Sequence, residues 1–240
     1  METFDFGDGR GPVPAHQHPN GGGWVADSAT VEDTAFVGPD ALVYEDAIVS
    51  DQAVVADRSR VFGKATVSDR AILCDDVKVF DEAQVSNTAE VCGNAQVYGN
   101  SSVSCNARVY WNARIYENGK VYEDAQVHDN ASIRGDAQVH GAAEISGNSK
   151  VFDHADVSGD VRLYGTHVYG NDTIRSLSDL QTIISDRYRN PDAIALIDEL
   201  KSQIAALTDE VTVLRSQLEV LSVSNGDAGS LHHEPSGVTL

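Results

Sequence analysis

Residues 84–101 read QVSNTAEVCGNAQVYGNS, and this stretch repeats one six-residue unit three times. In each unit the second residue is valine and the sixth is alanine or serine. From 24 to 167 the chain divides without insertion or deletion into 24 such hexapeptides, and every second position is Val, Ile or Leu. The sixth position is Ala in 17 units and Ser in three. A fixed short period of this kind predicts a solenoid.

Each hexapeptide has the composition of a short strand followed by a turn. Val and Ile favour strands, whereas the Asp, Asn and Gly of the fourth and fifth positions accept the backbone angles of turns. A period of six leaves no continuous helical stripe, which excludes a helical body. Three hexapeptides close one triangular coil, with the aliphatic side chain inside and the small residue at the crowded corner. Eight such coils would form a rod ~38 Å long.

The repeat resembles that of the bacterial hexapeptide-repeat proteins, whose fold is a left-handed parallel β-helix. The resemblance covers 24–167, about 60% of the chain. It implies the left hand, which periodicity alone does not, because ordinary parallel crossovers are right-handed. The segment GGGWVADSATV, residues 21–31, resembles uncharacterised bacterial and phage members of the family. The expected fold class is therefore an all-β solenoid followed by a C-terminal α-helical coiled coil.

Residues that lie three hexapeptides apart should stack on one face of the rod. The outward position after the aliphatic residue is aromatic in six of eight coils on the first face: Tyr44, Phe62, Phe80, Tyr98, Tyr116 and Phe152. Exposed apolar strips usually mark contact surfaces, so these residues are candidates for a subunit interface or a docking surface. Two alternatives stay open, namely that the rings only stack on one another, or that the chain's own helices cover them.

The ends of the rod need covers, because open sheet edges invite pairing with other chains. We expect residues 1–23, rich in Gly and Pro, to fold over the first coil as an N-terminal cap. After the β-helix at 24–167, a helix within 168–189 is the candidate cap for the other end. A coiled-coil helix is predicted over 190–221, and 222–240 has the composition of a disordered tail.

The coiled-coil prediction rests on apolar residues that alternate steps of three and four. These seam residues are Ile197, Leu200, Ile204, Leu207, Val211, Leu214, Leu218 and Leu221. So narrow a stripe favours self-association over packing along the rod. Branched residues at the first seam position with Leu at the second favour a parallel dimer, whereas the family resemblance implies trimers. We expect a homo-oligomer and favour the trimer.

The charge of the chain disfavours several partners. Acidic residues number 37 against 17 basic ones, so the formal charge is -20. Proteins that bind nucleic acid or anionic membranes use Lys and Arg to neutralise their partner. The sequence has no apolar stretch long enough to span a membrane and no secretion signal at its start, which predicts a cytoplasmic or virion-associated protein.

Catalytic signals are weak. The family resemblance implies acyltransferases that use acyl-CoA, with a catalytic His beside a loop that interrupts the coils, but here 24 units pass without such a loop. His128 and His140 are weak catalytic candidates, and a lone surface His is more often solvated than catalytic. They sit on different faces of one chain, so three converging His ligands for a metal are not expected. No cofactor motif is present.

The three cysteines, Cys74, Cys92 and Cys105, lack the spacings of a zinc site or a disulfide framework. Cys74 and Cys92 lie three hexapeptides apart, which the repeat turns into neighbours. The favoured interpretation is reduced thiols in a reducing cytoplasm.

The sequence therefore predicts a non-enzymatic structural or interaction protein that presents a surface to a protein or saccharide, as a bacterial or phage component. The first alternative is a hexapeptide-class acyltransferase. The second is an acidic mimic of DNA, which is disfavoured because turns need Asp in any case.

Overall fold

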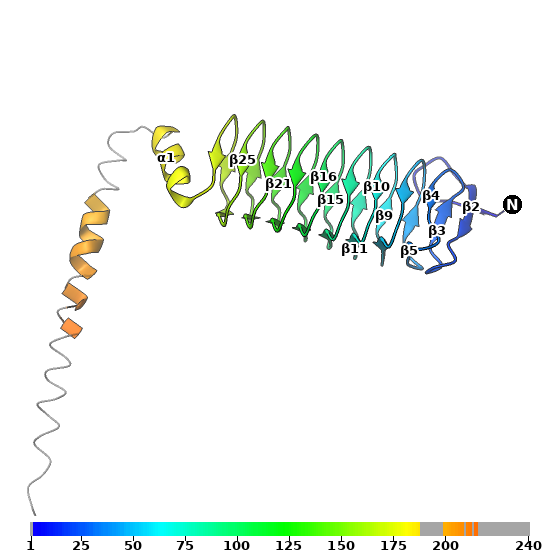
Figure 1. Cartoon of the computed structure of the whole chain (residues 1–240), viewed down its shortest axis with the longest axis horizontal. Helices are drawn as coiled ribbons and strands as arrows, with labels where there is room; N and C mark the ends of the chain where they lie inside the picture. Colours follow the sequence, from blue (N-terminus) through cyan, green and yellow to red (C-terminus); the bar gives the residue numbers. More distant parts are fainter. Residues whose placement is uncertain (1, 188–198, 209, 213, 216–240) are drawn as a thin grey trace, which may run out of the picture. The chain divides into compact units, whose positions relative to one another are not determined.

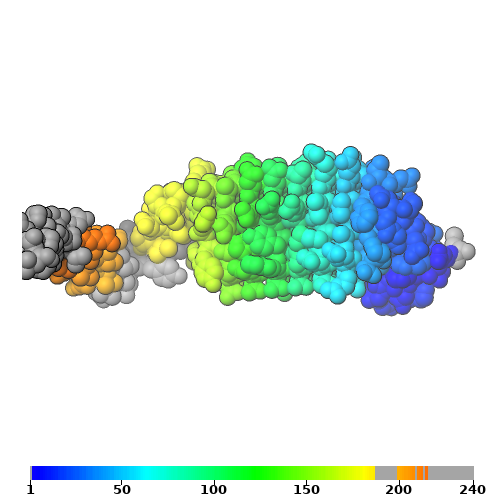
Figure 2. All heavy atoms as spheres, turned by 90° about the horizontal axis from the view of Figure 1, so that it is seen from below, coloured from blue at the N-terminus to red at the C-terminus, as the bar shows by residue number. Residues whose placement is uncertain are grey.

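A computed structural model describes residues 2–187, 199–208, 210–212 and 214–215 of the chain. Met1–Ile183 forms one compact unit and Ile184–Leu240 a second. The first unit is a parallel β-solenoid of short strands in three sheets (Figure 1). In space-filling view its coils form successive layers of one continuous body (Figure 2). The repeat thus builds the solenoid that its period predicts.

Each sheet forms one face of the solenoid, and consecutive strands of a face are separated by one full coil of three hexapeptides. Face 1 contains β3 (Trp24–Ala26), β6 (Leu42–Val43), β9 (Arg60–Val61), β12 (Lys78–Val79), β15 (Gln96–Val97), β18 (Arg114–Ile115), β21 (Ser132–Ile133), β24 (Lys150–Val151) and β27 (His167–Val168). Face 2 contains β4 (Thr30–Val31), β7 (Ile48–Val49), β10 (Thr66–Val67), β13 (Gln84–Val85), β16 (Ser102–Val103), β19 (Lys120–Val121), β22 (Gln138–Val139), β25 (Asp156–Val157) and β28 (Thr173–Ile174). Face 3 contains β5 (Phe36–Val37), β8 (Val54–Val55), β11 (Ile72–Leu73), β14 (Glu90–Val91), β17 (Arg108–Val109), β20 (Gln126–Val127), β23 (Glu144–Ser146) and β26 (Arg162–Tyr164).

The core is a single aliphatic column along the axis of the solenoid. Every second-position side chain from Val37 to Val157 has 0% of its surface exposed. The corner alanines, such as Ala95 and Ala113, are buried to the same extent. Branched side chains fill the column, and most corners hold Ala or Ser because neighbouring strands approach closely where the chain turns; Val77 and Val161 are buried exceptions. First- and third-position residues point outward and form rows along each face.

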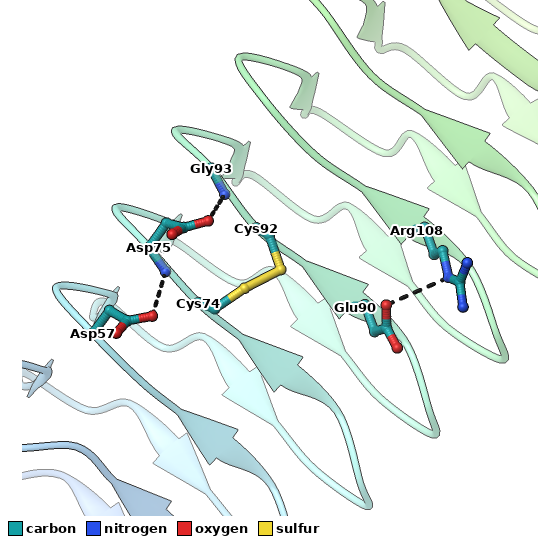
Figure 3. The surroundings of a disulfide bond; sticks show 7 residues. All are labelled: Asp57, Cys74, Asp75, Glu90, Cys92, Gly93 and Arg108. Carbon is teal, nitrogen blue, oxygen red and sulfur yellow. Dashed lines mark hydrogen bonds and ion pairs between the residues drawn. A yellow bond between two sulfur atoms is a disulfide. The ribbon is translucent and has the colours of Figure 1, made fainter.

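The turns explain why the fourth position is so often acidic or glycine. Its backbone is left-handed in every hexapeptide from Glu45 to Gly165, with φ of 64° at Asp75 and 75° at Gly93. Many of these residues also connect one coil to the next. Asp57 accepts the Asp75 amide at 3.0 Å, and Asp75 accepts the Gly93 amide at 2.9 Å (Figure 3). A turn carboxylate therefore satisfies a backbone donor of the next coil.

Residues 2–23 cover the first coil. β1 (Thr3–Phe4) pairs antiparallel with β2 (Val13–Gln17), which pairs antiparallel with β3. Phe6 is 3% exposed and stacks on Tyr44 with ring centroids 4.9 Å apart. The Asn20 side chain donates to the Ala35 carbonyl at 2.9 Å. This segment covers the edge that a bare first coil would expose.

The solenoid extends past His167, where the sequence predicted its end. His167 pairs with Lys150, and Thr173 pairs with Asp156. The partners in these two pairs are one residue closer in sequence than partners in the earlier coils, which are three full hexapeptides apart. Val168 and Ile174 still point inward and are buried. One residue is missing from the coil that precedes β27, and this deletion breaks the six-residue rhythm without breaking the fold.

The last coil is followed by α1 (Leu177–Arg187), whose Leu180 and Ile183 pack against the core. The helix begins with reciprocal capping. The Asp179 amide donates to the Ser176 hydroxyl at 3.3 Å, and the Arg175 amide donates to the Asp179 carboxylate at 2.8 Å. The hydrogen bonds that its carboxylate accepts, first of all from the Arg175 amide, lower the pKa of Asp179. The helix thus contributes apolar side chains to the end of the core.

In the second unit the described residues between 199 and 215 are helical. Five seam residues fall among them, and all are exposed in the single chain: Leu200, Ile204, Leu207, Val211 and Leu214. Ile197, Leu218 and Leu221 lie outside the described residues, as do the predicted helix start near 190 and the tail at 222–240. The structure therefore shows helix at this seam and leaves the coiled coil as a prediction.

Candidate binding surface

Five of the six outward aromatic residues of face 1 form a continuous stack, and together with Phe152 they are called here the aromatic row. Its first five members, Tyr44, Phe62, Phe80, Tyr98 and Tyr116, are nearly parallel, with centroids 4.8–5.0 Å apart and interplanar angles of 2–5°. Farther along, Arg134 lies over the Phe152 ring at 4.7 Å. Phe62, Phe80 and Tyr98 are stacked on both faces, so the edges of these rings are what remains for contact from outside. The row therefore stabilises the rod and presents ring edges to its surroundings.

Burial disfavours ionisation of hydroxyl groups in this row. Desolvation raises the pKa of both Tyr44 and Tyr98 above that of a free phenol. Like any tyrosine hydroxyl at neutral pH, that of Tyr98 can donate as well as accept hydrogen bonds.

A second row runs beside the aromatic row, at the first position of the face 1 strands. This first-position row consists of Arg60, Lys78, Gln96, Arg114, Ser132 and Lys150. From 24 to 152 the outward and inward strand residues of face 1 include no Asp or Glu, although the chain has 37 acidic residues. Face 1 is thus the basic face of an acidic protein.

Several cations outside the face 1 strands have an acidic partner, although the exposed Arg70 and Lys120 have no ion pair among the described residues. Arg58 pairs with Asp76, Arg108 with Glu90 and Arg162 with Glu144, and all three cations lie outside the face 1 strands. Within the described part of the chain, Lys78, Arg114 and Lys150 make no ion pair. All three side chains are exposed. Their charges are therefore available to a partner.

A groove lies beside the first half of this row, at the corner between faces 3 and 1. It has a volume of about 670 Å³. Its lining consists of Asp40, Arg58, Arg60, Asp76, Lys78, Asn94 and Gln96. The groove is polar, and Arg60, Lys78 and Gln96 give it one wall from the first-position row. A chain-like ligand could lie along it.

The two candidate histidines belong to matching arrangements on different faces. His128 on face 3 stacks on Tyr110 at 4.7 Å, with Nε2 3.2 Å from Glu144 Oε1. His140 on face 2 stacks on Tyr122 at 4.7 Å, with Nε2 3.0 Å from Asp156 Oδ1. These carboxylate partners are not predicted from the sequence, because they become adjacent to the histidines only in the coil register.

The structure does not bring the two histidines into one site. Each ring lies in the row of its own face, with one surface covered by a tyrosine. The arrangement orients an imidazole against a carboxylate, which could support proton transfer. The same contact also satisfies Nε2 of each ring, which is a structural cause without any catalytic role, whereas Nδ1 of His128 is buried without a hydrogen-bond partner.

Cys74 and Cys92 form a disulfide between adjacent coils of face 3 (Figure 3). This corrects the expectation of two reduced thiols. The coil register places the two residues side by side, with Cα atoms 4.7 Å apart. Together with Asp75 they are the one group among the described residues whose ligand atoms cluster as a metal site would require. The disulfide occupies both sulfurs, and Cys105 is free.

Searches against protein-family models, curated proteins and solved structures find no match to this chain. The similarity to hexapeptide-repeat proteins therefore rests on the repeat and on the parallel solenoid itself. Among the described residues, no helix has the length and apolar character needed to cross a membrane.

The first-position row is the feature that sequence reasoning missed. Its signal is present in the sequence, since Lys78, Arg114 and Lys150 recur at every second coil. The signal is hard to see because the basic residues look scattered along the chain and line up only when each face is considered by itself.

Proposed function

We propose that the protein is a non-enzymatic interaction rod that uses face 1 as its binding surface. One observation carries the proposal: face 1 combines an aromatic row with exposed cations that make no ion pair, and its strands from 24 to 152 contain no carboxylate, in a chain of charge -20. Because these cations are kept apart from carboxylates, the rod lacks ion pairs that they could otherwise make. A partner that supplies negative charge would provide those ion pairs. The stacked coils hold both rows at a fixed spacing.

The finer features of the rod belong to the same proposal. We expect a left-handed coil, as the resemblance to hexapeptide-repeat proteins implies. The exposed seam around Leu200, Ile204 and Leu207 supports association of copies through a coiled coil, with a homotrimer favoured over a dimer. Clustered rods would present several copies of face 1, and avidity would strengthen a weak contact. A structural component of a bacterium or phage fits this design.

Solution mass tests the oligomeric rod. The full chain should have a mass two or three times that of the monomer by light scattering. A version ending at residue 189 should be monomeric and retain its β-sheet circular dichroism, because the solenoid has its own core. If the truncated protein still has the mass of two or three copies, the coiled-coil association is contradicted.

An acyltransferase is the second candidate, and the carboxylate contacts of His128 and His140 are the observation in its favour. Against it, the strands from β3 to β28 succeed one another without an inserted loop that could form an acyl-CoA cleft. Acetyl-CoA should therefore leave the melting temperature unchanged. A concentration-dependent rise in melting temperature would favour the enzyme.

The acidic DNA mimic has weaker support from the geometry. Turn carboxylates such as Asp57 and Asp75 accept backbone amides of the next coil, so their placement has a structural cause.

A further inference from the structure

We infer that face 1 binds an acidic polysaccharide that carries a negative charge on every second sugar. This inference rests on the proposed function and names the partner of the same surface. It follows from the spacing of the cations, from the groups between them, and from the orientation of the aromatic rings.

The spacing of the cations is regular over five layers. From Lys78 onward the first-position row alternates strictly between a cation and a neutral polar residue: Lys78, Gln96, Arg114, Ser132 and Lys150. The three cations are exposed, and the two neutral residues between them are half-buried. Parallel strands place neighbouring layers ~4.8 Å apart, so successive cations are separated by ~9.6 Å. That interval is comparable to the length of a disaccharide unit.

The groups between the cations suit uncharged sugars. Gln96 and Ser132 can both donate and accept hydrogen bonds, as a hydroxyl-bearing ring requires. In the adjacent row the Ser132 layer also carries Arg134, whose guanidinium lies over the Phe152 ring at 4.7 Å. The protonated hydroxyl of Tyr98 adds a donor in the adjacent row, two residues after Gln96. The groove of about 670 Å³ includes Lys78 and Gln96 in its wall and lies beside the row. Asp40 and Asp76 also line it, and Asp76 is paired with Arg58, so an acidic chain would lie on the Lys78 side.

The aromatic row favours a saccharide over a single-stranded nucleic acid. Bases bind proteins by stacking on open ring faces. Here Phe62, Phe80 and Tyr98 stack on one another at 4.8–4.9 Å, so their faces are occupied. The outward edges carry the positive part of the ring quadrupole, which favours anions.

Charge density points the same way. Duplex DNA carries one negative charge per ~1.7 Å of axis, far denser than this row can match. A chain of charge -20 would repel so dense a polyanion. A sparse polyanion instead can meet one first-position cation per disaccharide and brings less negative charge against the acidic turns.

Calorimetric titration of the full chain with hyaluronan oligomers tests the inference, because this polymer alternates an acidic and a neutral sugar. Dextran serves as the neutral polymer and single-stranded DNA as the nucleic acid. We expect binding to hyaluronan that weakens as salt rises, and none to dextran. The triple variant K78Q/R114Q/K150Q should bind about tenfold more weakly or worse, since each exposed ion pair contributes modestly.

The matched control is R70Q/K120Q/R162Q, which removes the same charge from outside the face 1 strands and should bind like the unmodified protein. Equal losses in both triple variants would overturn the assignment to face 1. Tighter binding of DNA than of hyaluronan, or no binding of hyaluronan, would overturn the saccharide. If the oligomer mass is as expected while hyaluronan fails to bind, the proposal of an oligomeric rod is retained and only the proposed ligand is wrong.

Discussion

At the scale of single residues, the hexapeptide assigns a separate physical role to most of its positions. The second residue fills the axis, the sixth fits the corner, and the fourth adopts a left-handed turn. Because the roles repeat, a substitution at one coil has a clear reference in the coils beside it. Substitutions of Ala113 and Asp69 test the corner position and the turn position, which accept the fewest residue types.

Replacing Ala113 by Leu should destabilise the protein. Ala113 is 0% exposed at a corner, so the added methyl groups have no space and must displace the backbone. We expect a loss of about 1–3 kcal/mol in the free energy of unfolding, measured by urea denaturation. Gln84→Leu is the control, because Gln84 points outward on face 2 and should accept the same side chain with little change. Equal effects would contradict the packed corner.

Asp69 should tolerate Asn but not Ala. Its φ is 62°, and its carboxylate accepts both the backbone amide and the side-chain amide of Asn87, at 2.9 and 3.2 Å. Asn retains an acceptor oxygen and the tolerance of left-handed backbone, whereas Ala loses both. Asp69→Ala should cost about 1–2 kcal/mol of unfolding free energy. Thermal melts of the two variants in parallel check that Asn is tolerated better than Ala. If Asp69→Ala leaves the stability unchanged, the hydrogen bonds from turn carboxylates to the next coil contribute nothing to it.

At the scale of elements, the segments at the two ends of the solenoid and one disulfide stabilise it. The N-terminal strands and α1 cover its two ends. The Cys74–Cys92 disulfide joins the residues that directly follow β11 and β14. The caps follow from apolar residues placed beyond the repeat, whereas the disulfide depends on register, which makes it an independent check on the coil.

Reduction of the disulfide should lower stability. A link across a sequence separation of 18 restricts the unfolded chain, and a loop of this size contributes about 3 kcal/mol in the chain-entropy model. Urea denaturation of the unmodified protein should therefore shift to lower urea when a reductant is added. In C74S/C92S the reductant should have no effect, and that variant should match the reduced protein. If the unfolding curve of the unmodified protein is the same with and without reductant, the disulfide is contradicted.

At the scale of the whole molecule, the sequence predicts the body of the fold and little of its surface chemistry. Aliphatic second positions and small corners are read directly from the period, because packing demands them in every coil. The shortened coil before β27 is not predicted, since a one-residue deletion shifts the rhythm while Val168 and Ile174 keep their inward places.

The surface is harder to predict for a different reason. The contacts of His128 with Glu144 and of Cys74 with Cys92 join residues of different coils, and become visible only when the register is known. The residues of the aromatic row follow from the period. Their ring orientation, which leaves edges rather than faces outside, depends on side-chain geometry that no period encodes.

Both the stability of the rod and the alternating cations of face 1 depend on straight rows of equally spaced layers. Distances between paired spin labels on face 2 measure this spacing directly, in a chain whose native cysteines are replaced by serine. The label pairs 48/120, 48/138 and 30/138 span four, five and six layers from exposed first positions. The structure predicts separations of about 19, 24 and 29 Å, a rise of ~4.8 Å per layer. Separations that do not increase with layer number would contradict the parallel solenoid and every argument built on its rows.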